Sequence, residues 1–247
     1  MFESLINFFY ITLYQPLFNC LVFLYNYIPG HDFGIAIILL TLIIRIILYP
    51  LSVKAVNSQR SLQKLQPQMQ ELQKKYKNDK EKQAKETLAL YKKEKINPFS
   101  GLFLALIQLP ILIALYQVFW EGLNPKELVT LYSFISNPGQ INPLFLHIID
   151  LSKPNLVFAI LAGLIQYFQT KMLAPKSSPK INGQDKGTDF SQVMQKQMLY
   201  FFPIFTVIIL ISLPSALGLY WAVSGMFSII QQYLIFKKSD KLEIVKP

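Results

Sequence analysis

The stretch GIAIILLTLIIRIILYP, residues 34–50, is an apolar run that contains one charged residue, Arg45. An arginine in the middle of a membrane helix costs roughly 2.5–3.5 kcal/mol on insertion scales, so it usually faces water, a partner or a cavity. The plain alternative is snorkelling, in which the side chain reaches the membrane surface about 10 Å further along the helix. Small and polar residues recur at spacings of seven, four and seven, on one stripe of a helix: Gly34, Thr41, Arg45 and Ser52. This stripe favours a polar interior surface over snorkelling alone.

The composition is typical of a polytopic membrane protein. Of the 247 residues, 52 % are hydrophobic and 14 % aromatic, and the mean hydropathy is +0.34. We expect one all-α domain with five membrane spans, at 33–51, 99–120, 155–173, 199–213 and 215–236. The third and fourth spans are short for a hydrocarbon core of about 30 Å, so the bilayer around them is expected to be thin.

The positive charges lie almost entirely between the hydrophobic runs. Twelve Lys and Arg residues fall in 52–98, four in 174–198 and four in 237–247, whereas 1–32 and 121–154 together hold only two. Cytoplasmic loops carry the excess of Lys and Arg in membrane proteins. We therefore expect a multi-pass protein of a bacterial-type plasma membrane, with its N-terminus outside and its C-terminus in the cytoplasm.

Residues 1–32 are expected to form an amphipathic segment that lies in the membrane interface and continues into the first span. The pair Gln15-Pro16 is expected to divide it and to leave the apolar part after Pro16 too short to cross the membrane. The alternative is a sixth span over about 5–28.

The loop 52–98 has apolar residues at spacings of three and four, which predicts two helices of roughly 25 Å each, folded as a cytoplasmic hairpin. Asn78 is the expected N-cap of the second helix. Pro67 is expected to kink or restart the first. The plain alternative is a solvated spacer.

This hairpin has a net charge of +7, twelve basic against five acidic residues, which favours contact with anionic lipids, acidic nascent segments or ribosomal RNA. Only Tyr76 and Tyr91 offer stacking surfaces, so we expect no specific reading of nucleic acid. The candidate contact residues are Arg60, Lys64, Lys74, Lys75, Lys92 and Lys93.

Polar residues recur inside the other predicted spans as well. The plain interpretation is helix packing, in which small and hydrogen-bonding residues hold membrane helices together. The spans contain no Asp or Glu that could pair with Arg45, so that residue is expected to be hydrated or to await an external anion. Together they predict a hydrated cavity with a cationic wall, and the candidate groove residues are Thr41, Arg45, Gln108, Gln166, Gln169, Trp221 and Ser228.

Nothing in the sequence points to covalent chemistry. Cys20 is the only cysteine, and His31 and His147 lie far apart in the chain. There is no Ser/His/Asp set, metal-ligand cluster or phosphate-cradling glycine loop. We expect a protein that is not an enzyme and that needs no cofactor or metal.

Ordered motifs from about Gln15 to Phe236 resemble the YidC-type membrane protein insertases and their mitochondrial and chloroplast relatives. The motifs are Gln15-Pro16-Leu17-Phe18, Arg45 with Tyr49-Pro50-Leu51, Leu65-Gln66-Pro67, Ala89-Leu90-Tyr91-Lys92, Glu94-Lys95-Ile96-Asn97-Pro98, Ile107-Gln108-Leu109-Pro110-Ile111, Ala114-Leu115-Tyr116, Gly218-Leu219-Tyr220-Trp221 and Ile230-Gln231-Gln232.

The resemblance implies a core of five helices around a hydrophilic groove that opens to the cytoplasm and to lipid but is closed outside. Arg45 matches the groove arginine, and Gln166 and Trp221 resemble other groove positions. The hairpin would be a mobile element that meets the substrate. Nascent membrane proteins are the implied substrates, and the Sec translocon and the ribosome are candidate partners.

Three functions follow from these observations. The first is an insertase and chaperone that holds a short hydrophilic flank of its substrate near Arg45. The second is an anion channel or small transporter, which would need a polar path through the whole membrane. The apolar run Ile35 to Leu40 argues against such a path. The third is a structural subunit of a larger translocon, in which Arg45 is dispensable.

Overall fold

The computed structural model describes residues 2–97, 99–174 and 197–244. Most of the expected loop 174–198 and the last residues of the expected tail 237–247 therefore lie outside the described residues. The elements are α1 (Phe2–Phe9), η1 (Tyr10–Tyr14), α2 (Gln15–Tyr27), α3 (Phe33–Ile47), α4 (Tyr49–Lys75), α5 (Lys80–Lys93), α6 (Ser100–Trp120), η2 (Pro125–Thr130), β1 (Leu144–Phe145), β2 (Ile149–Asp150), α7 (Leu156–Leu173), η3 (Gln197–Phe201), α9 (Phe202–Leu210) and α10 (Ser215–Ile244).

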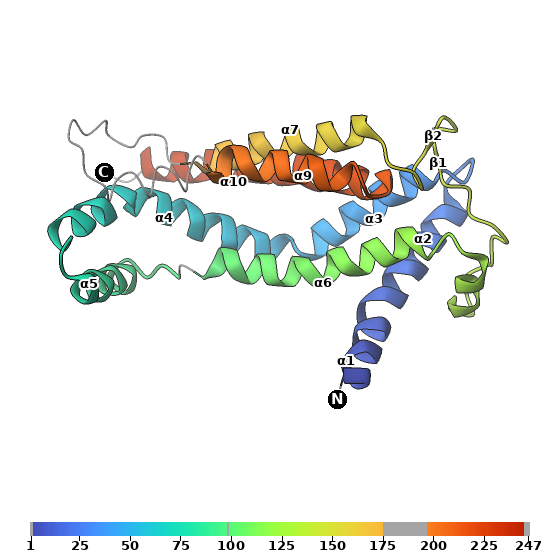
Figure 1. The fold of residues 1–247 in the computed structure, drawn as a ribbon, viewed down its shortest axis with the longest axis horizontal. Helices are drawn as coiled ribbons and strands as arrows, with labels where there is room; N and C mark the ends of the chain where they lie inside the picture. The colour runs from blue at the N-terminus through green and yellow to red at the C-terminus, as the bar shows by residue number, and fades with distance from the viewer. Residues whose placement is uncertain (1, 98, 175–196, 245–247) are drawn as a thin grey trace.

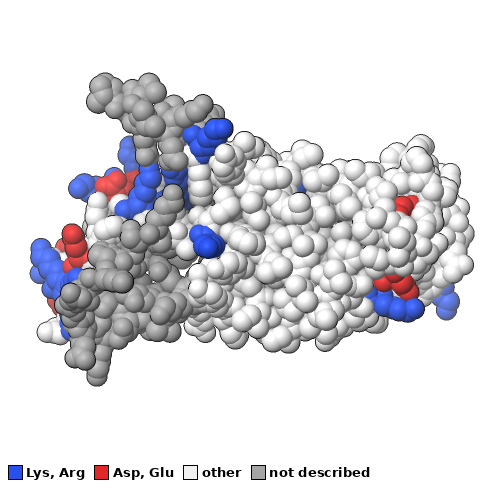
Figure 2. All heavy atoms as spheres, turned by 90° about the horizontal axis from the view of Figure 1, so that it is seen from above, with Lys and Arg blue, Asp and Glu red and all other residues white. Residues whose placement is uncertain are grey.

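The helices α6, α7, α9 and α10 run along the long axis of the molecule (Figure 1). Helix α10 contacts α7 and α3, α7 contacts α9, and α4 contacts α6. On the face that Figure 2 shows, charged side chains gather toward the two ends, and a wide uncharged band lies between them. This distribution is that of helices which cross a membrane.

Within the described residues, three helices are long and apolar enough to span a membrane: Glu3–Tyr27, Leu156–Leu173 and Ser215–Lys237. The pair α3 and α4, bent by 66°, gives a fourth candidate. Shorter apolar helices occur at Leu106–Trp120 and Gln197–Leu210. The protein is thus a mostly helical, multi-pass membrane protein, while the count of five spans stays a prediction.

The first predicted span, 33–51, is not one straight helix. Helix α3 ends at Ile47, and α4 begins at Tyr49 after the 66° bend. Pro50 lies in the first turn of α4. A proline there lacks the N–H that would continue the α3 hydrogen bonds, but it is well accommodated at a helix start. Helix α4 then continues through Pro67, so this proline does not restart the helix.

Helices α4 and α5 contact each other and form the two arms of the hairpin. The Tyr91 hydroxyl donates to Met69 Sδ at 3.3 Å, and burial raises the pKa of this tyrosine. The prediction of Asn78 as N-cap is wrong: Asp79 caps α5, and its carboxylate accepts a bond from the Lys82 N–H at 2.9 Å. A carboxylate fits this position because it also interacts favourably with the helix dipole.

The expected division at Gln15-Pro16 is wrong. Elements α1, η1 and α2 follow one another without a break, and Pro16 lies in the first turn of α2, where a proline is tolerated. This long helix runs steeply across the direction of α6, α7 and α10 (Figure 1). It does not continue into α3, because the chain turns at Gly30 and His31, whose φ angles are +80° and +49°.

The segment between α6 and α7 is bound to α2 and to the start of α3. The Asn19 side chain accepts a bond from the Tyr132 N–H at 2.6 Å and donates to the Thr130 carbonyl at 3.3 Å. The buried Asp32 carboxylate accepts bonds from the N–H groups of Ile35 at 2.9 Å and Leu146 at 2.5 Å. We call this part of the molecule, α2 with residues 121–155 and the helix ends they contact, the loop end. The opposite part, with α4 and α5, is the hairpin end.

Candidate functional site

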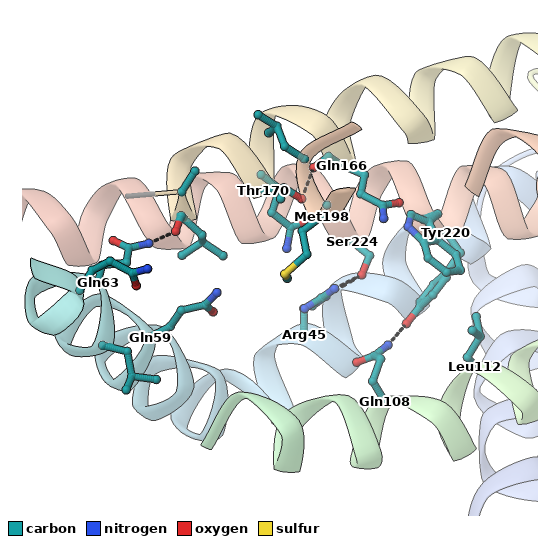
Figure 3. Close-up of a pocket in the computed structure, with 18 residues that line it drawn as sticks. Arg45, Gln59, Gln63, Gln108, Leu112, Gln166, Thr170, Met198, Tyr220 and Ser224 are labelled. Atoms are coloured by element: carbon teal, nitrogen blue, oxygen red, sulfur yellow. Dashed lines mark hydrogen bonds between the residues drawn. The ribbon is translucent and has the colours of Figure 1, made fainter. Parts of the chain in front are cut away.

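A cavity of about 650 Å³ lies between α3, α4, α6, α7, η3 and α10 (Figure 3). It is lined by Arg45, Gln59, Leu62, Gln63, Gln66, Gln108, Leu112, Gln166, Gln169, Thr170, Leu173, Ala174, Met198, Leu199, Tyr220, Trp221, Ser224 and Gly225. Within the described part of the chain, Arg45 is the one charged residue in this lining.

Arg45 lies in the last turn of α3 and reaches across to α10. Its Nε donates to Ser224 Oγ at 2.7 Å, and its Nη2 donates to the same oxygen. In the part of the chain that the structure describes, no Asp or Glu forms an ion pair with Arg45. A guanidinium has five N–H donors, so Ser224 leaves most of them available to an acceptor in the cavity.

A second polar pair joins α6 to α10. The Gln108 amide donates to the Tyr220 hydroxyl, and Tyr220 lies one turn before Ser224 on the same face of α10. Both α10 residues are buried, at 3 % and 4 % exposure. Tyr220 and Ser224 thus present hydroxyl groups to the cavity from a rigid helix face.

Helix α7 supplies the wall with Gln166, Gln169 and Thr170. The Gln166 Oε1 atom is buried and accepts no hydrogen bond from any residue that the structure describes. Leaving a buried acceptor unpaired costs about 1–3 kcal/mol, so this atom is not explained by stability. Gly225 lets α7 and α10 pack closely here, because a Cβ at that position would lie 2.5 Å from Ile165 Cγ2.

Helix α4 forms the wall toward the hairpin end, and it is attached to two other helices. Gln63 donates to the carbonyl of Leu173, the last residue of α7. Arg60 donates to the Phe236 carbonyl at 3.1 Å and stacks on the ring of that residue at 5.0 Å. These contacts hold the first arm of the hairpin against α7 and α10 along one side of the cavity.

Five of the predicted groove residues line this cavity: Arg45, Gln108, Gln166, Gln169 and Trp221. Thr41 and Ser228 do not. Their hydroxyls donate to the carbonyls of Ile37, at 2.6 Å, and Ser224, at 3.0 Å, each one turn earlier in its own helix. Both residues are almost fully buried, as the alternative interpretation of helix packing expects.

Sequence reasoning missed Ser224, Tyr220 and the three glutamines of α4. Ser224 could have been found, because it is three residues after Trp221 on a helix already assigned to the cavity. The glutamines were overlooked because 52–98 was assigned to a hairpin outside the membrane. Among the predicted hairpin cations, Lys64, Lys74, Lys75, Lys92 and Lys93 are exposed, whereas Arg60 is engaged with Phe236. Among the described residues, no His, Cys, Asp or Glu cluster could hold a metal.

The fold and the cavity together define a class, a multi-pass helical membrane protein with one cationic side chain in a polar cavity. The family model described as 60Kd inner membrane protein matches residues 23–242. The chain therefore belongs to the 60Kd inner membrane protein family. This finding confirms the resemblance that the motifs predict.

Two relatives and one solved structure illustrate the similarity. A "Membrane protein insertase YidC" of Fusobacterium nucleatum subsp. nucleatum is 33 % identical over 228 residues, which cover 92 % of this chain and 98 % of the relative. One of Syntrophus aciditrophicus is 35 % identical over 227 residues, covering 91 % of this chain but 36 % of the relative. The crystal structure of an active YidC insertase with its first transmembrane domain resolved is 29 % identical, with a TM-score of 0.53. That match covers 90 % of this chain and 46 % of the solved chain.

Proposed function

We propose that this protein inserts newly made membrane proteins into a bacterial inner membrane and assists their folding. Relatives named as insertases over almost the whole chain support this function, as do the family and the apolar helices. The observation that carries the mechanism is the position of Arg45, in a cavity whose described lining holds polar amides and hydroxyls beside apolar side chains but no carboxylate.

In this mechanism, a hydrophobic substrate segment moves along the lipid-facing side of the helices. Its short hydrophilic flank is held for a time in the cavity. Arg45 attracts an acidic flank, and this attraction is stronger in the low-dielectric surroundings of a membrane than in water. The Ser224 hydroxyl holds the guanidinium in place without neutralising it. Binding in the cavity lowers the cost of bringing the flank partway across the bilayer.

Two physical effects complete the transfer. The apolar helix Gln197–Leu210 of the fourth predicted span has 14 residues, about 21 Å of helix, so the bilayer around it is expected to be thin and the remaining path short. The membrane potential pulls an acidic flank outward, by about 2.3 kcal/mol per charge for each 100 mV. No covalent step, cofactor or nucleotide takes part in this proposal.

We assign the hairpin end to the cytoplasm, because the excess of Lys and Arg lies there. The steep direction of the helix Glu3–Tyr27 supports a position in the outer interface over a sixth span. Five spans then surround the cavity. The exposed lysines of α4 and α5 contact anionic lipids, and the Sec translocon and the ribosome are candidate partners.

The channel alternative requires a polar path through the loop end. Instead, Phe18, Phe33 and Phe119 are buried there at 0–1 % exposure, and they belong to one hydrophobic core. This packing favours a cavity closed on one side, which suits an insertase. If the protein is instead a structural subunit, or scaffold, of a larger translocon, Arg45 is dispensable. An experiment on Arg45 therefore separates the scaffold alternative from the insertase function.

The experiment compares the parent protein with Arg45→Ala and Arg45→Lys in liposomes. The substrate is a single-span protein with a short acidic N-terminal flank, and insertion is scored by protease protection. We expect Arg45→Ala to lower insertion tenfold or more and Arg45→Lys to retain most of it, because the positive charge carries the effect. Lys126→Ala, which removes an exposed cation of η2 at the loop end, is the matched control and should insert like the parent. Normal insertion by Arg45→Ala at equal protein levels would remove the charge-capture step and favour the scaffold.

A further inference from the structure

Amide side chains dominate the polar lining of the cavity. Six glutamines of the described residues line it, and they come from three helices: Gln59, Gln63 and Gln66 from α4, Gln108 from α6, and Gln166 and Gln169 from α7. By comparison, the described lining contains a single charged residue, Arg45. A cavity that bound only anions would not need so many neutral glutamine side chains.

The glutamines of α4 form a row that leads toward Arg45. Their spacings of four and three residues put them on one face of the helix. In Figure 3, Gln63 and Gln59 follow one another along α4, and Arg45 lies beyond them. Gln166 and Gln169 belong to another wall of the same cavity. A chain that enters from the hairpin end would meet amides before it meets the guanidinium.

Two of the six glutamines have a structural role, and two others do not show one. Gln63 donates to the Leu173 carbonyl and Gln108 to the Tyr220 hydroxyl, so both tie helices together. In contrast, the buried Gln166 Oε1 has no hydrogen-bond partner among the described residues. Gln59 lies between Gln63 and Arg45 in Figure 3 and points into the cavity. These two side chains are therefore suited to a ligand.

The chemistry of an amide matches that of a peptide backbone. A glutamine side chain offers two donors and an acceptor, and each backbone unit needs one N–H and one C=O partner. In the hydrocarbon of a membrane no water binds these backbone groups, so a flank that leaves the aqueous phase needs partners from the protein or from water held in the cavity. An extended flank cannot satisfy them by itself. Glutamine contacts supply the missing partners whatever the flank's side chains are.

We propose that Gln59 on α4 and Gln166 on α7 bind the peptide backbone of the substrate's hydrophilic flank in an extended conformation. The cavity then accepts flanks of any side-chain charge, and Arg45 adds a preference for acidic ones. This inference rests on the proposed insertase function and adds a second, charge-independent determinant of specificity to it.

The first experiment uses two single-span substrates whose flanks have equal length. One flank contains only Ser and Asn, and the other contains Asp. We expect the double variant Gln59→Leu/Gln166→Leu to lower insertion of both substrates by a similar factor, about fivefold. Arg45→Ala should instead act mainly on the acidic flank. The control is Gln68→Leu, an exposed residue nine positions after Gln59 on the opposite face of α4, which should insert both substrates normally.

The second experiment tests the backbone directly. A synthetic substrate carries ester bonds in place of the flank's peptide bonds, which removes N–H donors and leaves the side chains unchanged. We expect the ratio of amide to ester insertion to be at least threefold higher with the parent than with Gln166→Leu. Equal ratios would overturn the inference. This single variant keeps the test valid if the double variant does not fold.

The outcomes separate the two proposals. If the parent inserts neither substrate, the insertase function itself fails. If the parent inserts both and Arg45→Ala lowers the acidic one, while the glutamine variants behave like the parent, the insertase function stands and the backbone inference is wrong. The backbone inference would also be wrong if the glutamine variants lowered insertion only of the substrate with the acidic flank, because the glutamines would then act through Arg45.

Discussion

Helices α3 and α10 reach both the loop end and the hairpin end of the molecule, but they present different kinds of side chain at the two ends. Helix α3 contributes Phe33 to the dry core at one end and Arg45 to the cavity at the other. Helix α10 likewise begins with Ala216 and Leu217 in the core and continues with Ser224 in the cavity. One end is therefore a packed apolar core, and the other encloses a cavity lined by both polar and apolar side chains.

Polar groups differ between the two ends in the same way. At the loop end, they are paired: Asp32 accepts two backbone N–H bonds, and Asn19 both donates and accepts. At the hairpin end, the buried side-chain oxygens of Gln166 and Gln232 have no hydrogen-bond partner among the described residues. Buried polar groups are normally satisfied. Polar groups therefore serve stability at the loop end, whereas at the hairpin end some tie helices together, as Gln63 and Gln108 do, and others remain available to a ligand.

The largest effect on stability is expected at the loop end, for Phe18→Ala. Phe18 has 0 % exposure, and its ring packs beside Gly122, where a Cβ would come within 2.9 Å. Removing such a ring leaves a cavity and costs about 3–5 kcal/mol. The measurement is unfolding in mixed micelles. Phe8→Ala, on the same long helix but 66 % exposed, should change stability by less than about 0.5 kcal/mol. Similar losses for both variants would contradict the division between the two ends.

An intermediate effect is expected for Asp32→Ala, which leaves the N–H groups of Ile35 and Leu146 without their acceptor. The loss should be about 1–3 kcal/mol. Hydrogen exchange at the Leu146 amide should become faster. The comparison variant is Asp79→Ala, which removes the cap of α5 at the exposed hairpin and should cost about 1 kcal/mol or less. An unchanged Leu146 exchange rate would show that Asp32 does not hold the segment between α6 and α7.

The smallest effect is expected for Gln166→Leu, within about 0.5 kcal/mol of the parent or slightly stabilising, because it removes an unpaired buried oxygen. At the loop end the same kind of change, Asn19→Leu, removes bonds to Thr130 and Tyr132 and should cost about 1–3 kcal/mol. Both are measured by unfolding in mixed micelles. A large loss for Gln166→Leu would mean that this residue supports the fold, and the contrast would disappear.

Much of the helix arrangement could be predicted from local signals. The apolar runs mark α6, α7 and α10 to within a residue or two of their observed starts, because a long apolar run in a membrane protein has few alternatives to a helix. Local signals were less reliable at proline and at helix caps. Pro16 and Pro67 lie within continuous helical segments. The N-cap of α5 is Asp79 and not its neighbour Asn78. Proline is tolerated in the first turn of a helix, as Pro16 shows, and Asn and Asp are both favoured N-caps, so residue type alone does not choose between Asn78 and Asp79.

The sequence alone determined that Arg45 is an isolated charge in an apolar helix, that the basic residues gather in a few loops, and which family the chain belongs to. Only the tertiary structure decided that the partner of Arg45 is Ser224, which lies 179 residues away. It also decided that Thr41 and Ser228 pack between helices, and that α4 forms one wall of the cavity. The physical reason is that helical periodicity fixes which residues share a face, whereas the side chains that meet across helices depend on how whole faces pack.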